Sequence, residues 1–166
     1  MLSMITKSSF KDLLIFLDFS HENNVFEKNF PHLNATMSAD FSKGKLIFPE
    51  QIKGRERNDS FNSPENFVVF ECVHHLLNKG YRPEHIELEK EWHLGHDSKS
   101  GRADICVTDE YGSMLFIIEC KTWGKEFDNA FKDTELDGGQ LFSYWQQEQS
   151  CKWLVLYSSN FNEGLY

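Results

Sequence analysis

The chain has 166 residues, a hydrophobic content of 40% and a formal net charge of −9 at pH 7. This charge argues against strong nonspecific DNA binding by the chain alone, because contacts with phosphates supply most of that affinity. No apolar run approaches the roughly 20 residues of a membrane span, and no signal peptide is evident. The four cysteines lie far apart and form no Cys-x-x-Cys motif, which argues against a zinc site or a disulfide framework. We therefore expect a cytoplasmic globular protein.

Residues 1–62 are expected to form an irregular N-terminal extension packed on a core at residues 63–166. A short helix is predicted over Phe10–Leu17, and a hairpin over Ser38–Phe41 and Leu46–Phe48 around a Lys-Gly pair. The polar residues 53–62 indicate a loop. Nothing in the pattern suggests a natural end at residue 166, so we expect this chain to be a fragment of a larger protein.

Strong helix signals begin at residue 63. Ser63 can serve as the N-cap, Pro64 suits the first turn, and Gly80 suits the position after the last turn. Glu65 lies at the N-terminal end of the face that we expect to pack on a sheet. A carboxylate there can interact with the helix dipole or contribute to a functional site. Glu71, on another face, is the second candidate for such a role.

A strand is predicted at Ile86–Leu94, followed by a polar turn to residue 101. Glu89 and Glu91 on this strand either approach a functional site or lie on a solvated face. Two histidine pairs, at residues 74–75 and 93–96, could suggest metal ligands. Adjacent histidines on a helix point in different directions, however, and no third ligand has a suitable spacing, so we expect no metal site there.

A β-hairpin is predicted over residues 101–121, because two short apolar runs flank a polar patch that contains glycine. If Asp109 pairs with Met114 across a four-residue loop, antiparallel register places Asp104 directly opposite Glu119 on one face of the sheet. The opposite face then carries the apolar residues Phe116, Ile118 and Cys120.

Lys121 follows Glu119 by two residues and therefore lies on the same face as the two carboxylates. Carboxylates about 4–5 Å apart repel by about 1 kcal/mol in water and by more when buried. A hard divalent cation offsets this repulsion, and Mg²⁺ typically takes one or two carboxylates plus waters and phosphates. From the hairpin alone, a salt bridge between Lys121 and Glu119 beside an exposed Asp104 explains the pattern equally well.

Three further elements are predicted after the hairpin. A short helix is expected near Asn129–Lys132, and another begins after a pair of glycines and carries Gln140 and Tyr144 four residues apart, on one face. These two side chains could hold a phosphate or simply belong to a packed helix. Trp153–Ser158 is predicted to be a buried strand.

The order of these motifs resembles the PD-(D/E)XK nuclease superfamily. The chain is similar to nuclease domains of bacterial restriction-modification enzymes, including the N-terminal part of type I restriction R subunits. The resemblance rests on Asp104, on Glu119-x-Lys121, on Gln140-x-x-x-Tyr144 in the following helix and on Glu65 in the preceding one. It covers residues 63–159 and departs from the usual motif at Ala103, where proline is common.

This resemblance implies an α/β core like that of restriction endonucleases, with a mixed sheet of about four strands flanked by helices. It also implies a Mg²⁺ site, with Mn²⁺ as a substitute, held by Asp104, Glu119 and the carbonyl of Cys120. Lys121 would position or activate the attacking water, and Glu65 would assist at a second shell or a second metal. Gln140 and Tyr144 would orient the phosphate or Lys121.

The implied function is a Mg²⁺-dependent DNA endonuclease domain of a restriction-modification enzyme. Its expected partners are double-stranded DNA and the methyltransferase, specificity or motor domains or subunits of the same system. The alternative is a catalytically inactive nuclease-like module that docks partners or positions DNA. A cysteine hydrolase using Cys120 is disfavoured, because this thiol lies on the face opposite Glu119 and no histidine is clearly placed to serve it.

Overall fold

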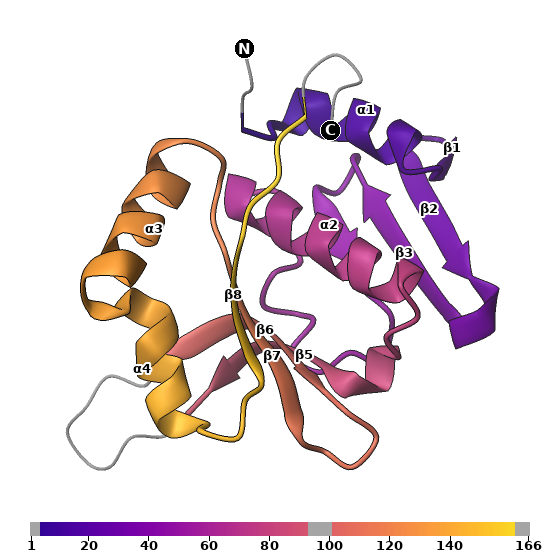
Figure 1. Cartoon of the computed structure of the whole chain (residues 1–166). Helices are drawn as coiled ribbons and strands as arrows, with labels where there is room; N and C mark the ends of the chain where they lie inside the picture. Colours follow the sequence, from indigo (N-terminus) through magenta and orange to yellow (C-terminus); the bar gives the residue numbers. More distant parts are fainter. Residues whose placement is uncertain (1–3, 93–100, 162–166) are drawn as a thin grey trace.

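The computed structural model describes residues 4–92 and 101–161. Its strands form two four-stranded sheets, ordered β1-β2-β3-β4 and β5-β6-β7-β8. Helix α2 (Pro64–Asn78) lies between them, with the N-terminal sheet on one side and the second sheet on the other (Figure 1). One hydrophobic cluster includes buried residues from both sheets and from α2. Among the described residues, no helix is long and apolar enough to cross a membrane.

The N-terminal part is more regular than the sequence suggested. Helix α1 (Lys7–Phe16) precedes the strands β1 (Ser20–Glu22), β2 (Val25–Phe30), β3 (Ala35–Asp40) and β4 (Lys45–Ile47), and a 3₁₀ turn at Pro31–Leu33 links β2 to β3. All four strands pair antiparallel. The predicted hairpin around the Lys-Gly pair is present as β3–β4, in which Asp40 pairs with Lys45. The domain boundary at residue 62 stays a prediction.

Helix α2 begins as predicted, since the Ser63 side chain accepts a hydrogen bond from the Glu65 N–H and Pro64 occupies the first turn. Gly80 follows the helix with φ of +91°, a conformation that favours glycine. Ten of the fifteen helix residues are buried. Burial on this scale, rather than helix propensity, anchors α2 and so fixes the position of its first turn.

The second sheet is mixed. Strands β5 (Ile86–Glu91), β6 (Arg102–Thr108) and β7 (Met114–Cys120) pair antiparallel, whereas β8 (Trp153–Tyr157) pairs parallel to β7. The crossover from β7 to β8 contains α3 (Lys125–Asp137) and α4 (Gly139–Gln147). Helix α2 covers one face of the sheet, and α4 packs on the other through Leu141 and Tyr144. This α/β core with a mixed four-stranded sheet confirms the predicted fold class.

The hairpin register differs from the prediction near its turn. Thr108, not Asp109, pairs with Met114. Asp109 therefore belongs to the loop, which is one residue longer than predicted. A bulge follows at Leu115, because Val107 pairs with Phe116. The bulge restores the predicted register, and Ile105 lies opposite Ile118 as expected.

Three other predictions need correction. Helix α3 extends over Lys125–Asp137 rather than four residues, and none of its described side chains is buried. Strand β5 ends at Glu91 and does not include Trp92, whereas the predicted end at residue 94 lies outside the described residues. Strand β8 is the edge of the sheet, with Trp153 exposed and its other residues half-buried, rather than a buried strand.

Candidate active site

Asp104 and Glu119 meet at the end of the β6–β7 hairpin that lies away from its turn. The register of the pair Ile105–Ile118 continues to place them opposite each other, as the sequence predicted. Their exposed fractions are only 8% and 2%. Oδ2 of Asp104 accepts a hydrogen bond of 2.6 Å from the backbone N–H of Cys120. This bond fixes the Asp104 carboxylate against the backbone of β7.

Both carboxyl groups bind protons more tightly than they would in water. Burial, followed by the charge of Glu119, raises the pKa of Asp104 to about 8. Burial also raises the pKa of Glu119, although the ammonium group of Lys121 opposes this shift. Two buried carboxyl groups side by side disfavour simultaneous ionisation unless a cation is present. The pair is therefore suited to receive a cation.

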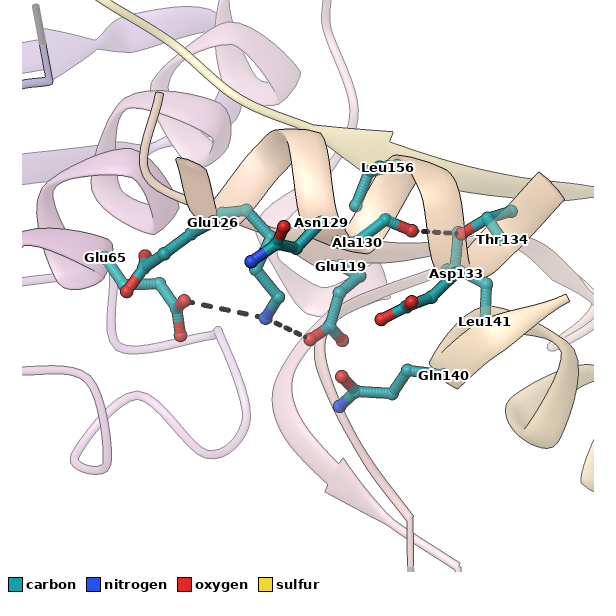
Figure 2. Close-up of a pocket in the computed structure, with 11 residues that line it drawn as sticks. Glu65, Glu119, Glu126, Asn129, Ala130, Asp133, Thr134, Gln140, Leu141 and Leu156 are labelled. Atoms are coloured by element: carbon teal, nitrogen blue, oxygen red, sulfur yellow. Dashed lines mark hydrogen bonds and ion pairs between the residues drawn. The ribbon is translucent and has the colours of Figure 1, made fainter. Parts of the chain in front are cut away.

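Lys121 links two carboxylates from different elements. Its Nζ lies 2.5 Å from Oε1 of Glu119 and 3.5 Å from Oε2 of Glu65. Dashed lines mark these contacts of Glu119 and Glu65 in Figure 2. Burial acts to lower the pKa of Lys121, but Glu119, Glu65 and Asp104 together raise it above its usual value. The lysine is therefore a cation at neutral pH. The first turn of α2 brings Glu65 to this position, as predicted.

Gln140 and Tyr144 reach the same site from α4. The Gln140 amide donates to the Tyr144 hydroxyl, which in turn donates to the backbone carbonyl of Arg102. The hydroxyl also lies 3.1 Å from Oε2 of Glu119. Tyr144 is fully buried, so these contacts hold the Glu119 carboxylate from the side opposite Lys121.

A cavity of about 330 Å³, which α3 closes on one side, is bordered by Glu119, Lys121, Glu65 and Gln140. Glu126, Asn129 and Asp133 of α3 point into it together with Glu65, Glu119 and Gln140 (Figure 2). The sequence interpretation did not include the three α3 residues. Their spacing of three to four residues marks one helix face and was the available signal. The cavity is strongly acidic, with one lysine among four carboxylates.

Other candidates from the sequence lie elsewhere. Glu71 is buried on α2, where it contacts the Tyr157 hydroxyl at 2.6 Å and His75 at 2.5 Å. His74 packs against the rings of Phe19 and Phe30. Residues 93 and 96 lie outside the described residues.

Three further predicted residues differ in their surroundings. The thiol of Cys120 belongs to the core on the α2 side, and burial raises its pKa well above the usual range. Its side chain is therefore not part of the acidic cavity, which agrees with the predicted alternation. Glu89 is buried and pairs with Arg102, whereas Glu91 is exposed and pairs with Arg57 at 2.6 Å.

The site offers a small set of hard oxygen donors for a metal ion. Within residues 4–92 and 101–161, no group of three or more His, Cys, Asp or Glu side chains is arranged to hold a metal ion. A cation at Asp104 and Glu119 would therefore need further oxygens from the backbone, water or substrate. Mg²⁺ is commonly bound in this way, so the donors present fit it.

The fold is consistent with an α/β nuclease-like core. The family model described as "Type I restriction enzyme R protein N terminus" matches residues 64–161, which is more than half of the chain. The chain belongs to this family. A search of curated proteins finds no match.

Proposed function

We propose that this chain is a Mg²⁺-dependent endonuclease domain of a type I restriction enzyme and that it hydrolyses DNA phosphodiester bonds. The observation that carries the proposal is the convergence of Asp104, Glu119 and Lys121 at one end of a hairpin, in a chain of this family. Two carboxyl groups buried side by side cost stability. Such costs are typical of functional sites.

Asp104, Glu119 and the carbonyl of Cys120 would hold the metal. When bound, Mg²⁺ would supply charge stabilisation for the phosphate and lower the pKa of a coordinated water. The four carboxylates around the cavity support a role for a bound metal ion. A phosphodiester is negatively charged, so it could enter such an acidic cavity only if cations offset the repulsion.

Lys121 would act as a cation that positions the attacking water and stabilises negative charge on the phosphate. Its raised pKa argues against a role as a general base, since it keeps its proton at neutral pH. Glu65 would orient Lys121 through the contact of 3.5 Å. A role for Glu65 at a second metal stays a prediction.

Tyr144→Phe tests the role of α4. The variant removes the hydroxyl that contacts Glu119, Gln140 and the Arg102 carbonyl, and we expect the cleavage rate to fall about 10- to 100-fold. Stability should fall by about 1–2 kcal/mol, since the lost bonds are buried. Tyr111→Phe is a matched control, because Tyr111 is exposed in the hairpin loop. Equal cleavage by Tyr144→Phe and wild type would exclude this role.

The proposed partners are double-stranded DNA and the methyltransferase, specificity or motor domains or subunits of the same system. The net charge of −9 weakens the attraction of this chain for DNA, so the partners would raise its affinity for DNA. A cytoplasmic location follows from this proposal.

The alternative is an inactive docking or DNA-positioning module, and calorimetry with Mg²⁺ and Mn²⁺ separates it from a nuclease. We expect the wild type to bind the metal and Asp104→Asn to lose most of the heat. Because the pKa of Asp104 is about 8, binding at pH 7 should release a proton, and the measured heat should vary with the buffer. Identical titrations for both proteins would support the docking module.

A further inference from the structure

A second hollow adjoins the acidic cavity on the other side of Gln140. It has a volume of about 410 Å³ and is lined by Glu91, Gly101, Arg102, Gln140, Ser143 and Tyr144. Gln140 borders both spaces. The Ser143 hydroxyl donates to the Gln140 carbonyl at 2.6 Å, so the hollow presents a guanidinium group and an amide beside the residues that would hold the scissile phosphate. Groups of this kind bind phosphate oxygens.

Arg102 is held in place from two directions. Its backbone carbonyl accepts a hydrogen bond from Tyr144, whose hydroxyl also contacts Glu119. Its side-chain Nε pairs with Glu89. The side chain is still 56% exposed, and a guanidinium group has five N–H donors in a planar fork. Within the described residues Glu89 is the only ion-pair partner of Arg102, through Nε, so the other edges of the fork can meet a ligand.

The anchor of Arg102 is itself unusual. Glu89 is 6% exposed and has φ of +54°, although it is not a glycine. Left-handed backbone is costly for such a residue and persists where surrounding contacts enforce it. Arg57 donates to the Glu89 carbonyl at 3.2 Å, which is one of those contacts. The sheet therefore accepts local strain at the residue that holds Arg102.

We propose that Arg102 binds a DNA phosphate next to the scissile one, with Glu89 as its positioning residue. The proposal rests on the proposed nuclease function and adds a phosphate-binding subsite to it. The neighbouring phosphate lies in the hollow beside Gln140 and Ser143, while the reacting phosphate lies at Asp104 and Glu119. Arg102 gives this side of the acidic cavity an exposed guanidinium group, whereas Glu91 is paired with Arg57.

The test uses the double variant Glu89→Gln/Arg102→Gln in the full chain. Both charges of the pair are removed, so the net charge is unchanged and no buried carboxylate is left unpaired. Binding of a short fluorescein-labelled DNA duplex is followed by anisotropy in Ca²⁺ over a range of salt concentrations. The matched control is Arg82→Gln/Glu84→Gln, which removes an exposed ion pair of 3.7 Å near the turn of the hairpin.

We expect the Glu89/Arg102 double variant to bind about 3- to 10-fold more weakly, with a salt slope lower by about 1, because each phosphate contact contributes nearly one released counterion. The control should match the wild type in both measurements. Wild-type affinity and slope in the double variant would overturn the proposal, and so would a wild type that does not bind the duplex. Cleavage in Mg²⁺ is measured separately. If binding depends on Arg102 but no cleavage occurs, the nuclease function is contradicted and the phosphate-binding role of Arg102 is not.

Discussion

Asp104→Asn is expected to abolish DNA cleavage and at the same time to stabilise the protein. The variant removes a carboxylate from the metal site, and an amide is a poor Mg²⁺ ligand compared with a carboxylate. Its carbonyl oxygen can still accept the N–H of Cys120, and its NH₂ group can donate toward Glu119. The hydrogen bond at 2.6 Å in the wild type is thus retained while the buried ionisable carboxyl group is lost.

The stability gain should depend on pH in a defined direction. Asp104 has a pKa of about 8 in the folded chain and an ordinary value of 3.8. The folded chain holds this proton more tightly than the unfolded chain does. The free energy of unfolding is therefore highest below about pH 4 and falls as the pH rises through 8. Asparagine does not titrate, so the advantage of the variant should grow from pH 4 to pH 8 and then level off.

At pH 7 we expect a gain of about 1–2 kcal/mol, or about 2–8 °C in the melting temperature. Thermal unfolding without metal, measured between pH 4 and pH 9, checks this. Asp109→Asn is the control, because Asp109 lies in the same hairpin but is half-exposed and accepts the N–H groups of Tyr111 and Ser113. If Asp104→Asn is less stable than wild type at every pH, the raised pKa of Asp104 in the folded chain is contradicted.

Lys121→Ala is expected to lower the cleavage rate by about 100- to 1000-fold or more, which is typical for the loss of one cationic or hydrogen-bond donor at a reacting centre. The fold should survive, because Glu119 is still held by Tyr144 at 3.1 Å and becomes neutral more readily without its cation. Rates are measured under single-turnover conditions on a labelled duplex, with folding verified by circular dichroism.

Lys125→Ala is the matched control for this variant. Lys125 lies four residues further along the chain and is exposed at the start of α3. Its removal changes the net charge by the same amount but takes nothing from the cavity. Comparable losses in both variants would show that overall charge, rather than the position of Lys121, governs the rate.

The relation between sequence and structure differs from one element to the next. The Asp104–Glu119 pairing was predictable because strand periodicity and a short loop fix the register. The predicted loop was wrong by one residue, yet the bulge at Leu115 compensated for the error. Helix α2 was predictable from its N-cap, its proline and its terminal glycine, each of which acts locally.

Other elements could not be read from apolar patterns. Helix α3 buries none of its described side chains. It therefore lacks the buried apolar face by which most helices are predicted, and its contribution to the acidic cavity was not predicted. In the N-terminal sheet, β1 and β2 meet at Asn23 and Asn24, with φ of +49° and +65°. An Asn-Asn pair between short strands suits a tight hairpin turn, and this local signal was overlooked.

Metal-dependent nicking of supercoiled plasmid tests the central claim most directly. The wild-type chain is incubated with Mg²⁺ or Mn²⁺, with and without excess EDTA, beside Asp104→Asn and Lys121→Ala. A metal-dependent endonuclease converts the plasmid to open circles, and this conversion disappears in EDTA and in both variants. Nicking that continues in EDTA, or that either variant retains at the wild-type rate, would contradict a metal-dependent site at Asp104, Glu119 and Lys121.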